Sequence, residues 1–288
     1  MTKISEINDN EIRVIGGNGG DGGKKRIPWW VWVVAGVVAV AIAVIALYPK
    51  PQPETQQDSV PTFEITTEPY DTSAWHSNID VSLPSCTFVT DTLIDTLHLR
   101  IFTPYNATPE LHVGRLDTND TDIILAAMAA DLRRDNGKIV GAFVYAGEPL
   151  SWGLSKKGYC AIIDERITIG VAENSPLFEQ MTETGGYFFR QYPAVTNGMM
   201  VKNNPENASF RRALCVLNDR VCIVACTDRV LMNDFSSSLV KLGVSEAILL
   251  VGGTADGWCR TADGKMERLG SSYAQNAKYM NHIVFRKQ

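Results

Sequence analysis

The feature that most constrains this chain is an uncharged apolar span near its N-terminus. Residues 29–48 read WWVWVVAGVVAVAIAVIALY, without a single charged side chain. As a helix, this span measures about 30 Å, which matches the hydrocarbon core of a bilayer. Tryptophans at its start and Tyr48 at its end are aromatic residues of the kind found at membrane interfaces. The span therefore predicts one transmembrane helix.

The residues around the span predict its orientation. Lys24, Lys25 and Arg26 precede it directly, and such residues remain on the cytoplasmic side. A cleaved signal peptide is the alternative, although the span is long for one and residues 1–28 precede it. We expect a signal-anchor that holds a single-pass protein in the membrane, with an extracytoplasmic C-terminal domain, either periplasmic or extracellular. The expected parts are a cytoplasmic glycine-rich tail (1–28), the transmembrane helix (29–48), a proline-rich stalk (49–75) and a globular domain (76–288).

Charge and metal-ligand spacing exclude several classes of partner. The net charge is −5, and no lysine- or arginine-rich face stands out after the span, so nucleic acid is not expected as a partner. The six cysteines follow the span but form no Cys-x-x-Cys pair, and the four histidines are dispersed. Neither a metal site nor a cofactor is predicted. Buried free thiols are the favoured state of the cysteines, with disulfides as the alternative.

Short apolar segments separated by turn residues indicate an α+β fold with mixed or antiparallel sheets and a few packed helices. Hairpins are expected around Asp164-Glu165, Asn218-Asp219 and the turn at 262–265. A helix is expected over 123–134, and a second runs from Asn233 or Asp234 to Lys241 and ends before Gly243. The run from Ile248 to Val251 predicts a central, fully buried strand. Further strands are expected at 86–93, 95–104, 111–113, 138–145 and 281–285.

Residues 191–255 contain a series of short motifs in a fixed order. They are Gln191-Tyr192-Pro193, Asn197-Gly198, Arg211-Arg212-Ala213, Leu242-Gly243-Val244 and Val251-Gly252-Gly253-Thr254-Ala255. This order resembles the C-terminal half of the phosphodiester glycosidase family, whose domains are of the N-acetylglucosamine-1-phosphodiester alpha-N-acetylglucosaminidase type. The family has Arg-Thr-Ala, Leu-Gly-Ala and Asp-Gly-Gly-Gly-Ser at the last three places. Upstream, Gly141-Ala142-Phe143 resembles the end of its Asn-Gly-Gly-Phe-Phe strand.

The resemblance implies hydrolysis of sugar phosphodiesters in envelope or secreted glycans. Arg211 and the turn of Gly252, Gly253 and Thr254 would then bind the phosphate, since guanidinium and backbone N–H groups both bind anions. The carboxylate of Asp228 or Asp256, each just past a strand, would supply the catalytic acid/base function.

Two further expectations concern the shape of the site. Glu148 and Trp152 follow an expected strand and together could hold a sugar ring by hydrogen bonding and stacking. Because successive strand residues face opposite ways, we expect Arg211 to face the cleft and Arg212 to face away from it.

Departures from the family pattern keep a second interpretation open. Val251 and Ala255 stand where the family has an acid and a serine, and Val140 precedes Gly141 where it has an asparagine. The sequence therefore leaves open whether the domain is an active enzyme. The alternatives are a catalytically degenerate glycan-binding module and a structural envelope module of the same fold.

Overall fold

The computed structural model describes residues 62–63, 75–253, 255–269 and 280–288. The predicted transmembrane helix at 29–48, the tail before it and most of the predicted stalk lie outside these ranges. The chain divides between Gln57 and Asp58, and every element below belongs to the unit that follows. Within the described ranges, no helix has both the length and the apolar character needed to cross a bilayer.

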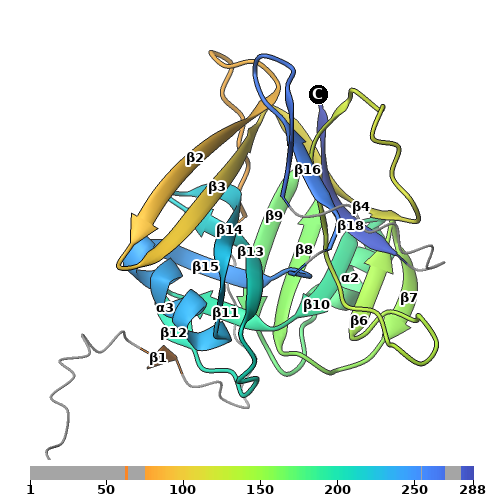
Figure 1. Ribbon diagram of the computed structural model, residues 1–288. Coiled ribbons are helices and arrows are strands. Elements are labelled where there is room, and N and C mark those ends of the chain that lie inside the picture. The colour runs from red at the N-terminus through yellow and green to blue at the C-terminus, as the bar shows by residue number, and fades with distance from the viewer. Residues whose placement is uncertain (1–61, 64–74, 254, 270–279) are drawn as a thin grey trace, which may run out of the picture. The chain divides into compact units, whose positions relative to one another are not determined.

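The described residues of this unit form three β-sheets and two helices (Figure 1). The large sheet has the strand order β1 (Thr62–Phe63), β12 (Met199–Val201), β11 (Pro193–Thr196), β15 (Val244–Leu249), β13 (Ser209–Leu217), β14 (Arg220–Val230), β3 (Leu97–Tyr105) and β2 (Cys86–Ile94). The β10 sheet has the order β7 (Glu148–Trp152), β6 (Ala142–Tyr145), β10 (Tyr187–Gln191), β8 (Gly158–Ile163) and β9 (Arg166–Val171). The β5 sheet has the order β17 (Met266–Arg268), β16 (Gly257–Arg260), β5 (Ile123–Met128), β18 (Asn281–Lys287) and β4 (Ala107–Val113).

The strand pairs are antiparallel, except that β1 runs parallel to β12. Side chains from all three sheets meet in one core, to which the large sheet contributes Ile248, the β10 sheet Phe189 and the β5 sheet Ile283. Helix α3 (Met232–Leu242) packs its apolar face on the opposite side of the large sheet. Helix α2 (Leu177–Thr184) does the same on the β10 sheet. This arrangement is an α+β fold, as the sequence predicts.

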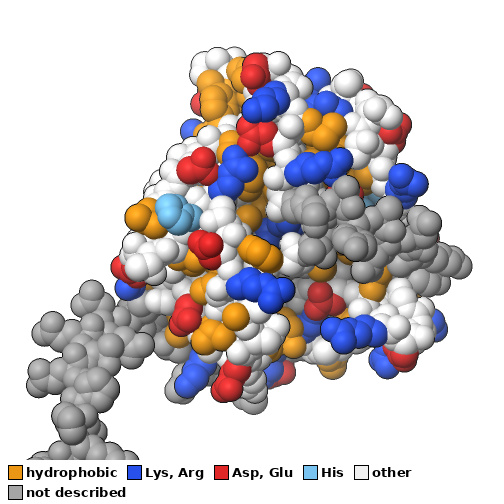
Figure 2. All heavy atoms as spheres, viewed as in Figure 1, with side chains coloured by type: hydrophobic (Ala, Val, Ile, Leu, Met, Phe, Trp, Pro, Cys, Tyr) orange, Lys and Arg blue, Asp and Glu red, His pale blue; other side chains and the backbone are white. Residues whose placement is uncertain are grey.

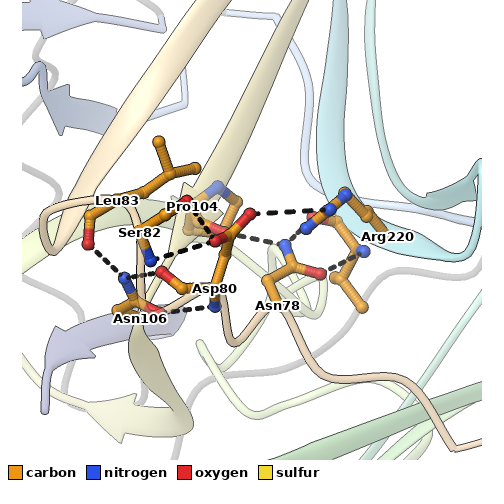
Figure 3. A network of polar contacts seen from close by, with 8 residues as sticks. Asn78, Asp80, Ser82, Leu83, Pro104, Asn106 and Arg220 are labelled. Atoms are coloured by element: carbon orange, nitrogen blue, oxygen red, sulfur yellow. Dashed lines mark hydrogen bonds and ion pairs between the residues drawn. The ribbon is translucent and has the colours of Figure 1, made fainter.

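A network of paired polar groups fixes the start of the domain (Figure 3). The Asn78 side chain donates to the carbonyls of Pro104 (2.7 Å) and Val221 (2.6 Å) and accepts the N–H of Val221 (2.8 Å). It thereby joins β3 to β14. Two residues earlier, His76 pairs with Ile167 of β9. The segment therefore links the large sheet to the β10 sheet.

Asn106 completes this network from the turn between β3 and β4. Its amide donates to the carbonyls of Asp80 (2.8 Å) and Leu83 (2.6 Å) and accepts the N–H of Asp80 (2.7 Å). Asp80 in turn accepts from Ser82 and lies 3.9 Å from Arg220. We call this set of residues, together with Asn78, the Asn78 clasp.

Several predicted elements are confirmed. The hairpins at Asp164-Glu165 and Asn218-Asp219 form with positive φ angles at all four residues. Helix α3 ends at Gly243, whose φ is 94°. Cys215 and Cys222 lie opposite each other across the β13–β14 hairpin, and the six cysteines are free and buried.

Other predictions were wrong. Residues 123–128 form a strand and not a helix, because β16 and β18 pair with both edges of β5 and all six of its residues are buried. The cap of α3 is Leu231, without a side-chain hydrogen bond, because Asn233 is bonded to Asn203 instead. Strand β15 ends at Leu249, and Val251 is only half-buried beyond it. Helix α2 has no counterpart among the sequence predictions.

Candidate functional site

A cavity of about 370 Å³ opens beside the start of β13, the end of β14 and the turn that follows β15. Gly252 and Gly253 line it, so the structure brings both glycines together with Arg211, as predicted from the sequence. Three more arginines, which the sequence analysis did not select as ligands, share the wall with Arg211: they are Arg100, Arg212 and Arg268. We call this site the arginine cavity.

A β-bulge places both Arg211 and Arg212 at the cavity. The pairing of β13 with β14 shifts register between Phe210 and Arg212, so that Arg211 alone lies opposite three residues of β14. Its N–H donates to the sulfur of Cys226 (2.9 Å). Strict alternation of side chains fails at a bulge. The expectation that Arg212 points away from the cleft is therefore wrong.

The four guanidinium groups differ in their partners. Arg100 is bonded to Asp91 (2.8 Å) and Glu267 (2.7 Å), and Arg268 lies 3.8 Å from Asp256. Among the described residues, Arg211 and Arg212 form no ion pair with a carboxylate. Within the described residues, neither guanidinium is thus paired directly with a carboxylate, although the Asp256 carboxylate is near enough to Arg212 to oppose the lowering of its pKa.

Arg211 and Arg212 are held by backbone carbonyls. Arg211 donates to the carbonyls of Asn207 and Val230. Arg212 donates to the carbonyls of Leu269 (2.7 Å) and Asp256 (3.4 Å), while its Nε has no hydrogen-bond partner in the described part of the chain. Its side chain is enclosed, with an exposed fraction of 2%, and burial lowers its pKa to about 10. Burial also lowers the pKa of Arg211. An anion in the cavity would offset this loss of hydration.

The glycine turn is set by close packing against β13. A Cβ on Gly252 would lie 2.3 Å from the carbonyl oxygen of Phe210, so no other residue fits there. Gly253 adopts a φ of 67°, and its N–H donates to the same carbonyl (2.8 Å). The N–H of Gly253 is therefore already hydrogen-bonded within the protein and is not free to bind an anion, contrary to the predicted role of Gly253. Thr254, the third residue predicted for this turn, lies outside the described residues.

The two predicted catalytic carboxylates do not share a site. Asp256 lies at the edge of the arginine cavity, where its Oδ1 accepts the N–H of Gly257 (3.0 Å) and faces Arg268. Asp228 lines a different cavity of about 410 Å³, next to the turn between β2 and β3 and the start of α3. Of the two, only Asp256 is placed near the arginines.

Glu148 and Trp152 occupy opposite ends of β7, about 13 Å apart at the strand rise of each residue. They are too far apart to hold one sugar ring together, and neither lines the arginine cavity. Trp152 is 66% exposed at the edge of the β10 sheet. The predicted pairing of these two side chains is therefore not seen.

A second polar cluster, which the sequence analysis missed, lies where β10 meets β11. The ammonium of Lys156 forms an ion pair with Asp131, donates to Gln191 Oε1 (2.7 Å) and lies 4.9 Å from the centre of the Tyr192 ring. Burial lowers the pKa of Lys156, and Asp131 opposes this shift. In the sequence, the signal for this cluster is Gln191, which belongs to the first motif of the resemblance.

Figure 2 shows basic and acidic side chains interspersed over one face of the molecule. Selectivity for an anion is therefore expected to come from the cavity and not from a broad charged surface. Among the described residues, no three His, Cys, Asp or Glu side chains are grouped so that they could hold a metal ion.

No protein-family model matches the chain, and no curated protein matches its sequence. Several solved structures share its fold, among them the following two. The catalytic domain of zebrafish N-acetylglucosamine-1-phosphodiester alpha-N-acetylglucosaminidase, in a form auto-inhibited by its pro-peptide, matches with a TM-score of 0.52 and 11% identity, covering 74% of this chain and 87% of that one. A hypothetical protein from Synechocystis matches with a TM-score of 0.52 and 13% identity, covering 70% of this chain and 62% of that one.

Proposed function

We propose that this domain binds a sugar phosphodiester in the arginine cavity and hydrolyses it at the glycosidic carbon. The observation that carries the proposal is the pair Arg211 and Arg212, two guanidinium groups beside one cavity that form no ion pair with a carboxylate among the described residues. Guanidinium groups bind phosphate oxygens through two parallel hydrogen bonds. A cavity of about 370 Å³ is also in the size range of small-ligand sites. The fold shared with the zebrafish glycosidase supports the choice of substrate class.

The reaction needs a phosphate site and a group that moves a proton. Water adds to the anomeric carbon, the bond from that carbon to the phosphate oxygen breaks, and a reducing sugar and a phosphate monoester leave. In this proposal Arg212 holds the phosphate, with Arg211 beside it. Of the two predicted carboxylates, Asp256 lies 3.8 Å from Arg268 of the cavity wall, although Asp256 itself does not line the cavity.

The second candidate is a binding module of the same fold that does not catalyse hydrolysis. One observation favours it: among the described residues that line the arginine cavity, none is an aspartate or a glutamate. Val251 and Ala255, in place of the family's acid and serine, point the same way.

Binding and release of product distinguish the candidates. The full chain in detergent would be titrated with the benzyl phosphodiester of N-acetylglucosamine 1-phosphate by calorimetry, and free N-acetylglucosamine would be measured in parallel. Binding with release of sugar supports the enzyme, whereas binding without release supports the module. If the chain neither binds nor cleaves this probe, the proposed function is wrong.

We also propose that residues 29–48 anchor the protein, with the domain outside the cytoplasm. The uncharged span and the positive charges at Lys24, Lys25 and Arg26 support this topology. Protease added to intact cells should then remove the C-terminal domain. Protection until the cells are lysed would contradict the topology.

A further inference from the structure

The cluster formed by Lys156, Asp131 and Gln191 combines an enclosed cation with a partly exposed carboxylate. The side chain of Lys156 is 7% exposed, whereas that of its partner Asp131 is 41% exposed. Lys156 is enclosed by the Asp131 carboxylate, Gln191 Oε1 and the Tyr192 ring. The enclosed lysine therefore contacts one carboxylate oxygen, Oδ2, while much of the Asp131 side chain remains open to solvent.

The backbone around Lys156 is held in a conformation that few lysines adopt. Its φ is 66°, in the left-handed region, which costs about 1 kcal/mol or more for a residue with a Cβ. The buried guanidinium of Arg190 donates to the Lys156 carbonyl (3.3 Å) and also to the carbonyl of Ala172 (2.9 Å). A Cβ on Gly141 would lie 3.2 Å from the carbonyl of Ser155, so this loop packs directly on β6. These backbone contacts of the loop therefore fix the position of the Lys156 ammonium.

The cluster lies at the same end of β15 as the arginine cavity. Tyr192, beneath the Lys156 ammonium, accepts the N–H of Leu249 (2.8 Å) through its carbonyl. The N–H of Leu250 then donates to the carbonyl of Arg212 (2.8 Å).

The next residue, Val251, donates its N–H to the carbonyl of Met128 (3.2 Å), three residues before Asp131 in the chain. Leu249, the last residue of β15, and Leu250 after it are thus hydrogen-bonded to the backbone of one residue from each site, Tyr192 and Arg212.

We propose that Asp131 supplies the carboxylate that the arginine cavity lacks, and that Lys156 and Gln191 position it. This inference rests on the proposed function. Asp131 would accept a proton from the attacking water as the oxygen bonds to the anomeric carbon. The bonding electrons of the breaking carbon–oxygen bond go to the departing phosphate monoester. The proton then passes from Asp131 to solvent, which restores the carboxylate.

The test compares variants of the full chain on the same benzyl phosphodiester, with binding and sugar release measured separately. Asp131→Asn should lower kcat by about a hundredfold or more and leave Kd within about threefold. Asp135→Asn is the matched control, because Asp135 lies in the same segment and forms an exposed ion pair with Arg133 (3.1 Å). It should change neither value.

Lys156→Met tests the positioning role. It should lower kcat and leave Kd within about threefold, because the Asp131 carboxylate is then no longer held by a cation. Lys156→Arg keeps a cation there and should retain more of the rate than Lys156→Met, whereas a role in packing alone would give no such difference. If Asp131→Asn unfolds because Lys156 is left unpaired, the double variant Asp131→Asn, Lys156→Met removes both charges and should fold yet stay inactive.

Each outcome separates this inference from the proposed function. Full activity of a folded Asp131→Asn chain would overturn the role of Asp131 while the proposed function stands, and a hundredfold loss in Asp256→Asn alone would transfer the role to Asp256. Binding by the wild-type chain without sugar release at any pH would likewise overturn it, because there would be no reaction for Asp131 to serve. Absence of both binding and release would overturn the proposed function itself.

Discussion

The Asn78 clasp and the arginine cavity are both rich in polar groups, yet they satisfy those groups differently. The Asn78 amide makes three hydrogen bonds to backbone groups, and that of Asn106 does the same. In the cavity, Arg212 keeps an unpartnered Nε and forms no ion pair within the described part of the chain. Fully paired polar groups stabilise a fold, whereas a buried cation with spare hydrogen-bonding capacity is suited to a ligand. The difference predicts opposite effects of mutation at the two sites.

The largest effect is expected at the clasp. Asn78→Ala should lower the free energy of unfolding by about 4 kcal/mol, because two buried carbonyls and one N–H lose their partner. Urea denaturation would measure this loss, with Asn136→Ala in an exposed turn as the control. Affinity for the phosphodiester should stay unchanged. A loss of affinity in a folded Asn78→Ala chain would break the comparison, since the clasp would then serve the ligand as well.

Glu246 sharpens the comparison, because it is a buried charged residue outside both sites. Burial raises its pKa to about 7, although Glu246 Oε1 accepts the N–H of Asn197 (2.7 Å). A carboxyl with a raised folded-state pKa binds its proton more tightly in the folded chain. The tighter binding of this proton adds about 3 kcal/mol to the free energy of unfolding below pH 4.5. This contribution is lost as the pH rises through 7.

Glu246→Gln removes this dependence. The free energy of unfolding of the wild-type chain minus that of the variant should fall by about 3 kcal/mol between pH 4.5 and pH 8. Denaturation series at several pH values would measure it, with Glu148→Gln, an exposed carboxylate, as the control. A difference that stays constant with pH would show that Glu246 does not carry the raised pKa.

A smaller effect, on affinity, is expected at the cavity. Arg212→Met should weaken binding of the phosphodiester by about 2 kcal/mol, because a charge-assisted contact is lost. The free energy of unfolding should change by less than about 1 kcal/mol, because removing an unpaired buried charge offsets the lost hydrogen bonds. Arg133→Met, at an exposed arginine paired with Asp135, is the matched control for calorimetry.

This ranking reverses the order expected from the sequence for the two neighbouring arginines. Both guanidinium groups donate to two backbone carbonyls, but Arg212 is enclosed and has an Nε without a partner among the described residues, whereas Arg211 is only half-buried. Arg211→Ala should therefore weaken binding less than Arg212→Met. If Arg211→Ala has the larger effect, the carbonyl contacts of Arg211 must give way to the ligand.

The smallest effect is expected at Trp152. Because this side chain is exposed at the edge of β7 and does not line the cavity, Trp152→Ala should change affinity by less than about twofold. The same calorimetric titration measures it. A tenfold loss would place a sugar subsite on the β10 sheet and extend the ligand beyond the arginine cavity.

Local chemistry in the sequence determined much of this protein. Asp164-Glu165 and Asn218-Asp219 fix their hairpins, because such residues adopt the positive φ angles of tight turns at low cost. Gly243 ends α3 for the same reason. The sequence also singled out Arg211 and the Gly252-Gly253 turn, which the structure places at one cavity.

Only the tertiary structure decided the rest. Residues 123–128 become a strand because β16 and β18, more than a hundred residues further along the chain, pair with both of their edges. The bulge that brings Arg212 to the cavity depends on the register of β13 against β14. Lys156 meets Asp131 and Gln191 although 25 and 35 residues separate them. Local sequence sets turns and caps through the φ preferences of single residues, but the pairing of distant strands sets which side chains share a site.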